Sequence, residues 1–322
     1  MNVLNVVPMP SAPPPPLPNF PHVTVLLRET IDALEPAAGK TYVDATLGAG
    51  GHAEAILEVP GTRVLGIDRD ESALALATSR LARFGERFVP VKATFSQVLE
   101  VVNRYQVGKV DGICADVGVS SMQIDSPERG MSFRAEGPLD MRMDMSSGET
   151  ALELIASLSD NELADVIYKY GDERRSRRIA RCIKQAESAG ELQTTLDLRR
   201  AVVRAVGPAR VGGVDPATRT FQALRIAVNG ELSELAELLD AATRAIKTDG
   251  VLAVISFHSH EDRLVKTAFK ERTLWAPLTK KPVVPTDMES IANPRARSAK
   301  LRAARRIEPS ELFDDTTDWE DA

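Results

Sequence analysis

The stretch Asp44-Ala-Thr-Leu-Gly-Ala-Gly-Gly51 decides the fold class. It follows a short apolar run that begins at Thr41 and precedes a helix-like segment, and a second apolar run, 63–67, ends in Asp68. A glycine turn between two acids that each close a strand is typical of a nucleotide-type cofactor site. Glycines let backbone N–H groups approach a ligand, and the second acid can accept hydrogen bonds from ribose hydroxyls. The sequence therefore predicts an adenosine-type cofactor at this turn.

Outward from the turn, strand-like apolar runs alternate with helix-like segments. The expected strands are 41–46, 62–68, 87–93, 110–117 and 251–257, and the expected helices include 71–83 and 217–246. This alternation predicts an α/β fold with a doubly wound, mostly parallel, Rossmann-like sheet. The gap before the fifth strand is too long for one crossover and carries helix signals, such as the capping box Ser159-Asp-Asn-Glu162. We expect an inserted helical subdomain there, overhanging the carboxyl ends of the strands, where ligands of such sheets bind.

The two ends of the chain differ from its middle. Residues 1–21 are rich in proline, which favours polyproline II and cannot build a core, so we expect a disordered arm. The end, 308–322, carries seven acids and no base and is expected to be a disordered tail; without it the net charge rises from −6 to about +1. Between the ends we expect a discontinuous sheet domain, 22–124 and 215–307, with 125–214 as the inserted helical subdomain.

Length and composition restrict the class of protein. A chain of 322 residues with 43% apolar and 27% charged residues matches a globular protein with an ample core. No apolar run approaches the ~18 residues that span a membrane, and the N-terminus lacks the pattern of a secretory signal. Two distant cysteines, Cys114 and Cys182, argue against a disulfide framework and favour a reducing compartment. We expect a cytoplasmic protein without a membrane partner.

The acid at the start of the glycine turn bears on the identity of the cofactor. The segment 48–53 matches G-x-G-x-x-A loosely, although a tight strand–helix turn that needs glycine for backbone reasons would look the same. A phosphate-binding loop is disfavoured because no Gly-Lys-Ser/Thr follows. The carboxylate of Asp44 would repel a pyrophosphate and tolerate a cationic methionine moiety. The sequence therefore favours S-adenosylmethionine over a nicotinamide cofactor.

Asp116 closes the fourth expected strand and is followed by Val-Gly-Val-Ser-Ser-Met-Gln123. A carboxylate at that strand end would face both cofactor and substrate, although a loop cap is the plainer alternative. Two downstream segments, 127–133 and 137–144, are rich in glycine, methionine and paired charge without a packing period. We interpret them as ordered functional loops.

The fifth expected strand ends in Ser256-Phe-His-Ser-His-Glu-Asp262. Its two histidines and two acids could suggest a metal site, but the chain has no second cluster with ligand spacing. A helix that is capped by Ser259 and has the two acids in its first turn explains them as well. We therefore expect no metal and a substrate-facing role for His258.

Three basic clusters indicate an anionic partner. Five arginines lie between 174 and 181, a second cluster opens the helix at Pro216, and a third comprises Lys280, Lys281 and the segment 293–302. One charge run is usually a solvated face, but three in a nearly neutral core favour a phosphate backbone. The arginines that we assign to RNA binding are Arg174, Arg178 and Arg181, spaced i, i+4, i+7, together with Arg219, Arg295 and Arg297.

These segments together resemble one family, the RsmH (MraW) family of bacterial S-adenosylmethionine-dependent methyltransferases. The resemblance runs from about His22 to Arg305 and is carried by long motifs in a fixed order. The motifs are His22-Val-Thr-Val-Leu-Leu, the glycine turn ending Gly-Gly-His52, Asp116-Val-Gly-Val-Ser-Ser, Ser126-Pro-Glu-Arg-Gly, Gly137-Pro-Leu-Asp-Met-Arg-Met-Asp, Pro216-Ala-Thr-Arg-Thr-Phe-Gln-Ala, Ile255-Ser-Phe-His-Ser and Asn293-Pro-Arg-Ala-Arg-Ser.

The resemblance implies a class I methyltransferase fold and transfer of a methyl group from S-adenosylmethionine to N4 of a cytosine. The cytosine would lie in the decoding region of 16S ribosomal RNA, at the equivalent of cytosine 1402. The partner would be the small ribosomal subunit, recognised by a helical domain like the insertion at 125–214, and a homodimer is left open. The alternatives are a non-catalytic subunit-assembly factor and a methyltransferase for another substrate.

By the same resemblance, specific positions contact the cofactor. They are Gly50, Gly51, His52, Asp68, Phe95, Asp116 and Gln123. Asp68 would hold the ribose hydroxyls and Phe95 would pack near the adenine. Asp116 is also the candidate catalytic acceptor for the N–H groups of the amine, and His258 would orient the base or relay the released proton. The chain departs from the family pattern at Met122, Asp215 and His260, where the family has Pro, His and Leu.

Overall fold

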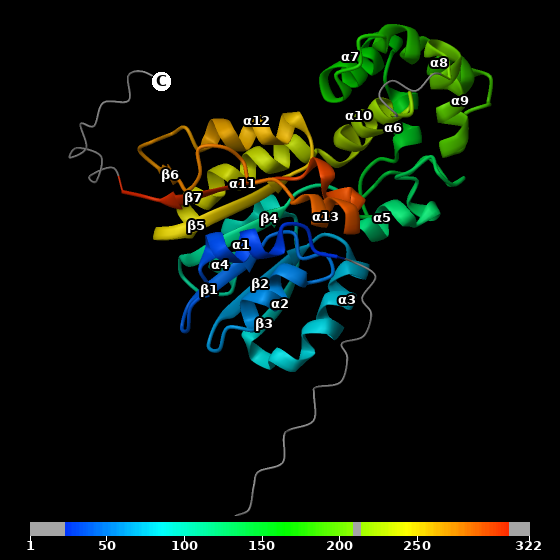
Figure 1. Cartoon of the computed structure of the whole chain (residues 1–322). Helices are drawn as coiled ribbons and strands as arrows, with labels where there is room; N and C mark the ends of the chain where they lie inside the picture. The colour runs from blue at the N-terminus through cyan, green and yellow to red at the C-terminus, as the bar shows by residue number, and fades with distance from the viewer. Residues whose placement is uncertain (1–22, 209–213, 309–322) are drawn as a thin grey trace, which may run out of the picture.

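Seven strands form one sheet, in the order β3-β2-β1-β4-β5-β7-β6, in the computed structural model, which describes residues 23–208 and 214–308 (Figure 1). The strands are β1 (Thr41–Asp44), β2 (Arg63–Asp68), β3 (Phe88–Lys92), β4 (Val110–Asp116), β5 (Ile246–Ser256), β6 (Trp275–Pro277) and β7 (Lys300–Arg306). The first five are parallel, and β7 and β6 add antiparallel pairs beyond β5. The predicted α/β class with a doubly wound sheet is confirmed.

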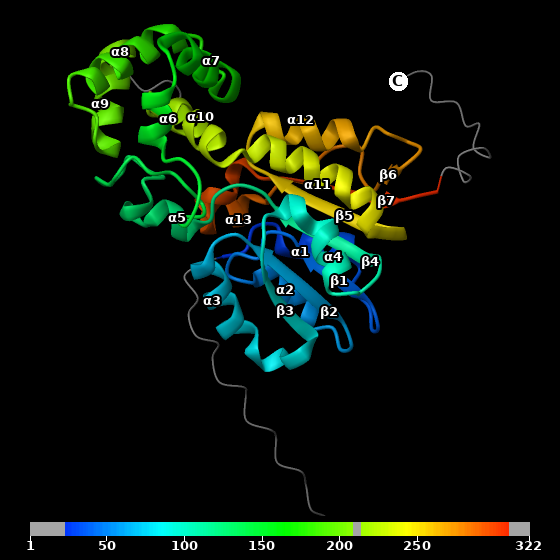
Figure 2. The same cartoon turned by 180° about the vertical axis from the view of Figure 1, so that it is seen from behind.

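Helices cover both faces of this sheet, as Figures 1 and 2 show from opposite sides. The helices of the sheet domain are α1 (Leu27–Leu34), α2 (Gly51–Leu57), α3 (Glu71–Leu81), α4 (Val98–Arg104), α11 (Glu231–Ala245), α12 (Ser259–Ala268) and α13 (Asp287–Ala292). One core holds Val101, Leu235 and Val265 of α4, α11 and α12. The opposite core holds Leu34 and Ile56 of α1 and α2. The strands are apolar on both sides because both faces are buried.

The stretch expected as one helix over 217–246 is two helices. α10 (Thr218–Asn229) ends at Gly230, whose φ of 60° lies in the left-handed region, and α11 starts at the next residue. The prediction of a continuous helix is wrong because the apolar period runs through a single glycine that redirects the chain. Glycine adopts this conformation without the steric cost that other residues carry.

A helical subdomain occupies the segment after β4. Its helices are α5 (Ser121–Asp125), α6 (Ala151–Ser157), α7 (Asp160–Gly171), α8 (Ser176–Ser188) and α9 (Thr195–Val206), with the 3-10 turn η3 (Pro127–Arg129) between α5 and α6. The other 3-10 turns are η1 (Ala82–Arg87), η2 (Phe95–Gln97) and η4 (Pro294–Ser298). The predicted capping box that opens α7 is present: Ser159 Oγ accepts from the Glu162 amide, and the Glu162 side chain accepts from the Ser159 amide. The subdomain stands beside α13 and leaves the sheet from the carboxyl end of β4 (Figures 1 and 2).

The subdomain has a hydrophobic core of its own, which includes Leu163 of α7, Ile179 of α8 and Leu198 of α9. Phe221 and Leu224 of α10 belong to the same core, although our expected boundary between 214 and 215 places α10 in the sheet domain. The proline-rich arm and the acidic tail after residue 308 lie outside the described residues. Among the described helices, none is long and apolar enough to cross a membrane.

Candidate active site

A cavity of about 310 Å³ lies at the carboxyl ends of the parallel strands. Six of the seven residues predicted to contact the cofactor line it: Gly51, His52, Asp68, Phe95, Asp116 and Gln123. They come from four separate segments that the sheet brings to one edge, after β1, β2, β3 and β4. This arrangement agrees with the general position of ligand sites in open α/β sheets.

The glycine turn is held by backbone hydrogen bonds to the end of β2. The Leu47 amide donates to the carbonyl of Ile67, and the Gly48 amide donates to Asp68 Oδ2 at 2.8 Å. Gly50 has a φ of 80° and faces away from the cavity, because a Cβ on it would lie 3.1 Å from Leu81 Cδ1 of α3. Gly50 is therefore required by the turn and by packing against α3, and it is the one predicted cofactor residue that does not line the cavity.

Asp68 is oriented by two backbone amides. Gly48 donates to Oδ2 and Asp70 donates to Oδ1, both at 2.8 Å, and burial raises the pKa of the carboxyl. Each carboxylate oxygen can accept more than one hydrogen bond, so the group retains capacity for ligand hydroxyls. Phe95 stands on the neighbouring strand end, with the Arg69 guanidinium 5.8 Å from its ring centroid.

Asp44 lies behind the glycine turn and is only 1% exposed. Its carboxylate accepts from the Ala53 amide in the first turn of α2 and from the Thr46 amide. Burial, and to a smaller extent the charge of Asp68, raise the pKa of Asp44 to about 7. Asp44 therefore acts on the cavity through its charge and its support of the loop, without lining the cavity.

Asp116 contributes the unsatisfied acceptor of the site. Its backbone amide donates to Thr46 Oγ1, but its carboxyl oxygen Oδ1 is buried and has no hydrogen-bond partner among the described residues. Burial, followed by the charges of Asp44 and Glu261, raises the pKa of Asp116 to about 8. Buried polar atoms are rarely left unpaired, so an orphaned acceptor in a cavity indicates a ligand donor.

A buried ion pair ties the cavity wall to the first functional loop. Arg129 of η3 pairs with Asp70, the N-cap of α3, and also donates to the carbonyl of Met143. Gln123 Nε2 donates to the same Asp70 carboxylate, and Gln123 Oε1 accepts from the Ser120 amide. These side chains fix α5 and the loop after it against the strand end that carries Asp68.

We expect Arg129→Met to destabilise the protein by about 3–5 kcal/mol, because it leaves the Asp70 carboxylate buried without its cation. Urea unfolding of the single variants and of Asp70→Asn/Arg129→Met measures this cost. The double variant should lose less stability than the sum of the single variants, since both charges are then gone. Strict additivity would contradict a coupled pair.

His258 caps α12, in place of the predicted Ser259. The helix starts at Ser259; His258 Nδ1 accepts from the Glu261 amide, and Glu261 Oε2 accepts from the His258 and Phe257 amides. The chain uses the residue one position earlier because Glu261, three residues after His258, completes the box. His258 Nε2 lies 3.0 Å from Glu261 Oε1, and His258 does not line the cavity.

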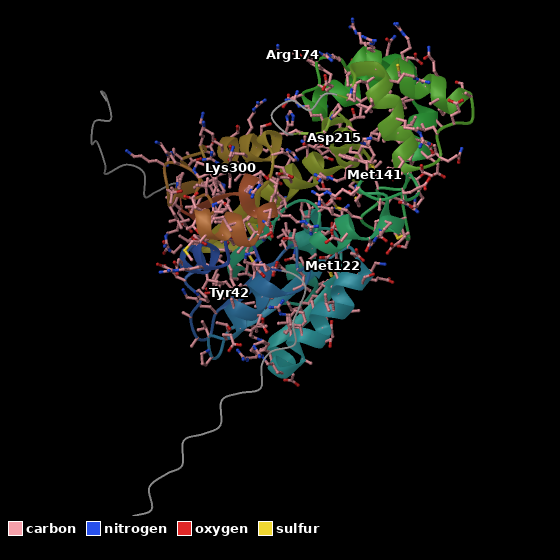
Figure 3. The ribbon with its side chains drawn as sticks, turned by 45° about the vertical axis from the view of Figure 1, so that its right-hand side comes forward. Tyr42, Met122, Met141, Arg174, Asp215 and Lys300 are labelled. Atoms are coloured by element: carbon pink, nitrogen blue, oxygen red, sulfur yellow. The ribbon has the colours of Figure 1, made fainter. Side chains whose placement is uncertain are left out.

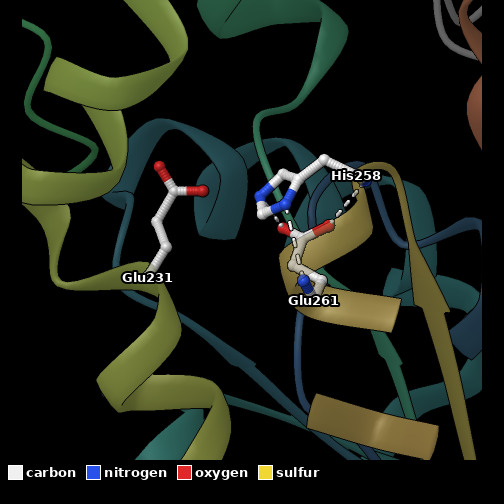
Figure 4. A group of neighbouring side chains, drawn as sticks. All are labelled: Glu231, His258 and Glu261. Carbon is white, nitrogen blue, oxygen red and sulfur yellow. Dashed lines mark hydrogen bonds and ion pairs between the residues drawn. The ribbon is translucent and has the colours of Figure 1, made fainter. Parts of the chain in front are cut away.

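Glu231, His258 and Glu261 offer ligand atoms within 4.8 Å of one another (Figure 4). Several of their polar atoms already have partners in this chain, although His258 Nε2 is buried and makes no hydrogen bond among the described residues. Both Glu231 oxygens bind Arg225, at 2.7 and 2.9 Å, and Glu261 and His258 bind each other and the start of α12. A guanidinium on one carboxylate and an imidazole used as a cap favour an internal polar network at this position over a metal site.

The predicted RNA-binding arginines come from several different elements. Arg178 and Arg181 are exposed on α8, whereas Arg174 precedes the helix, so the expected helical stripe of three is wrong at its first member. Figure 3 places Arg174 at the outer part of the helical subdomain. No ion pair within the described residues involves these three side chains.

The other three arginines lie outside α8, on α10 and η4. Arg219 donates to the carbonyl of Asp172, Arg297 donates to the carbonyl of Ser290, and Arg295 lines the cavity and pairs with Asp125. Their contacts therefore differ from those of the exposed α8 arginines.

Asp215 has a structural role that explains the departure from the family pattern. Its carboxylate pairs with Arg199 at 2.9 Å and accepts from the Ala217 amide at the start of α10. The sequence did not predict six other residues that line the cavity. They are Thr24, Thr46, Arg69, Phe257, Asn293 and Ser298. Each lies in or beside a segment singled out as a motif, but nothing in one sequence says which motif residue faces the cavity.

Comparisons with known proteins find one family that covers nearly the whole chain. A family model described as the MraW methylase family matches residues 19–307. A relative from Sorangium cellulosum (strain So ce56) named "Ribosomal RNA small subunit methyltransferase H" is 68% identical over 97% of this chain and 100% of the relative. One of the same name from Rhodopseudomonas palustris (strain BisA53) is 49% identical over 88% and 90%. A solved SAM-dependent O-methyltransferase from Thermotoga maritima has a TM-score of 0.41 and 10% identity, covering 90% of this chain and 69% of that chain.

Proposed function

This chain is an S-adenosylmethionine-dependent methyltransferase that belongs to the MraW methylase family, and from that premise we propose that it methylates N4 of a cytosine in 16S ribosomal RNA. The names of its relatives support the small-subunit ribosomal RNA as substrate. The observation that carries the choice of an amine as acceptor is the carboxyl of Asp116, which lines the cavity and whose buried Oδ1 has no hydrogen-bond partner among the described residues. The target is the cytosine 1402 equivalent of the decoding region.

The residues of the cavity fit the cofactor. Asp68 offers oriented acceptors for ribose hydroxyls, Phe95 offers an apolar face for the adenine, and Gly51 with His52 would hold the methionine end beside the start of α2. Carboxyls at Asp68 and Asp116 suit a cationic ligand. S-adenosylmethionine, when bound, supplies an electrophilic methyl group on its sulfonium.

Asp116 activates the acceptor amine. The lone pair of a cytosine N4 amine is delocalised into the ring, so the amine is a poor nucleophile. When Asp116 Oδ1 accepts a hydrogen bond from an N–H group of the amine, it favours tetrahedral geometry at N4. The carboxylate is also placed to take the proton that N4 must lose. Burial keeps Asp116 near its titration point at neutral pH, where a base of this kind works best.

His258 does not line the cavity itself but follows Phe257, which does. Its ring nitrogens face the Glu261 amide and the Glu261 carboxylate, which leaves the imidazole engaged with α12. We assign His258 a positioning role and leave the proton step to Asp116.

The helical subdomain and the arginines are assigned to RNA. A base inside RNA must be unstacked, or presented single-stranded, before its amine can enter a cavity at the strand ends. The exposed Arg174, Arg178 and Arg181 would hold the phosphate backbone on the outside, and Arg295 at the cavity rim would act close to the target nucleotide. Arg219 and Arg297 complete the proposed set, and ribosomal RNA as partner implies a cytoplasmic protein.

Mass spectrometry of nucleosides tests the proposal directly. Small subunits that lack the modification are incubated with the protein and S-adenosylmethionine, and the 16S ribosomal RNA is digested to nucleosides. We expect a new N4-methylcytidine signal that depends on both. Binding of subunits without any new methylated nucleoside would instead support the assembly-factor alternative, and a different methylated nucleoside would move the target.

A further inference from the structure

Phe257 stands at the edge of the cavity next to Asp116. β5 pairs with β4 so that Ile255 lies opposite Asp116, and the Val117 amide donates to the Ile255 carbonyl at 3.0 Å. Both chains continue in the same direction, so Phe257, two residues after Ile255, lies level with Gly118, two residues after Asp116. Phe257 is half-buried and lines the cavity.

The backbone opposite the Phe257 ring carries no side chain. Gly118 has a φ of 115°, and among the described residues a Cβ on it would have a single neighbour within 4 Å, Phe257 Cδ2 at 3.6 Å. The ring and the bare backbone of Gly118 therefore bound an open space beside the strand end of Asp116.

The backbone of Phe257 is clamped from behind. Its amide donates to Glu261 Oε2 at 2.8 Å, the same oxygen that accepts from the His258 amide, and Glu261 is only 1% exposed. The capping box of α12 thus positions an aromatic ring as well as a helix. A carboxylate buried to this extent needs such paired donors.

The cavity has one phenylalanine near each end. Phe95 follows β3 and Phe257 follows β5, and three strands, β2, β1 and β4, separate these two in the sheet. Methyl transfer from S-adenosylmethionine to a nucleobase brings two flat ring systems to one site, the adenine of the cofactor and the target base. Flipped or single-stranded bases are commonly held by stacking on aromatic side chains.

We propose that Phe257 is the stacking surface for the target base, holding it beside Gly118 with its amine toward Asp116. This inference rests on the proposed methylation of a nucleobase. It assigns the two phenylalanines opposite roles, with Phe95 serving the cofactor and Phe257 serving the substrate. A leucine at 257 would keep most of the apolar volume and lose the flat face.

Single-turnover methylation of unmodified small subunits by Phe257→Leu tests the proposal. Stacking on an aromatic side chain contributes enough that we expect transfer to slow by about 5- to 150-fold. Affinity for S-adenosylhomocysteine, measured by calorimetric titration, should stay at the wild-type value. Phe257→Tyr keeps the ring and should transfer at close to the wild-type rate, and Phe95→Leu should weaken S-adenosylhomocysteine binding.

Two results would overturn the role of Phe257: wild-type transfer by Phe257→Leu, or a loss of S-adenosylhomocysteine affinity equal to the loss in rate. If Phe257→Leu melts at a lower temperature than wild type, Phe257→Met and Phe257→Tyr form the comparison. Failure of the proposed function is a separate result, in which the wild-type protein itself produces no methylated cytosine.

Discussion

Asp116→Asn is expected to lower methyl transfer to ribosomal RNA by about 10²–10⁴-fold, the range for removal of a positioned proton acceptor. The amide keeps the shape of the side chain and can still accept one hydrogen bond, but it cannot take the proton from N4. The rate of single-turnover transfer to small subunits, measured by nucleoside mass spectrometry, gives the size of the loss.

A binding measurement separates the two roles assigned to Asp116. Titration with S-adenosylhomocysteine reports whether the variant still binds the adenosine and methionine moieties. Loss of transfer with retained affinity supports the acceptor role, and a parallel loss of affinity assigns Asp116 to cofactor binding alone. Turnover at the wild-type rate would remove Asp116 from the mechanism.

The same variant should be more stable than the wild type at alkaline pH. The pKa of Asp116 is raised from its ordinary value to about 8, so the folded state favours the protonated carboxyl. This contribution to stability is fully present below about pH 4 and is lost as the pH rises through about 8. Asparagine mimics the protonated form at every pH, so its advantage in melting temperature should grow from about pH 5 to about pH 9.

The charge of Asp44 contributes to the raised pKa of Asp116. When both carboxyls are ionised they repel each other, and Asp116→Asn removes that repulsion, so part of the stabilisation at alkaline pH comes from its relief. A flat difference in melting temperature across this range of pH would contradict the raised pKa. Activity and stability thus oppose each other at this position, as is common at active sites.

The features that the single sequence predicts correctly are those that depend on neighbouring residues. Asp68 and Asp116 close apolar runs, and the glycine turn between strand and helix is a local requirement of the backbone. Their meeting at one cavity follows because parallel strands end on the same edge. The capping box at Ser159 and Glu162 is equally local, since both partners lie within one helical turn.

The features that the sequence did not predict depend on contacts through space or on one backbone angle. Gly230 looks like a tolerated glycine within a helical period, yet it divides α10 from α11. Serine is the more common N-cap residue, but His258 caps α12 because it forms a capping box with Glu261. Gly50 matches the cofactor pattern and faces Leu81, while Phe257 lies in a motif that gave it no role and lines the cavity. In each case the deciding partner lies on another element or in a conformation that residue type alone leaves open.

Replacing Arg174, Arg178 and Arg181 together by glutamine is expected to weaken binding of the small-subunit ribosomal RNA by about 10- to 100-fold at low salt. The three side chains are exposed and form no ion pair within the described residues, so their charge is available to a polyanion. Because the variant neutralises fewer phosphates, its binding releases fewer counterions, and the log–log dependence of affinity on salt should flatten by about 2–3 units. Binding isotherms at several salt concentrations, with S-adenosylhomocysteine affinity as an internal check, measure both effects.

A matched control removes the same charge at the amino ends of the strands, opposite the cavity. Arg63 at the start of β2, Arg104 at the end of α4 and Lys109 before β4 are exposed and form no ion pair within the described residues, and their triple glutamine variant should bind RNA with nearly the wild-type affinity and salt dependence. Equal losses in the two triple variants would show that only net charge matters. Unchanged binding in the Arg174/Arg178/Arg181 variant would show that RNA does not cross this face of the helical subdomain. A loss confined to that variant would place the RNA backbone on the inserted helical subdomain. The RNA would then contact both this subdomain and, through its target base, the cavity.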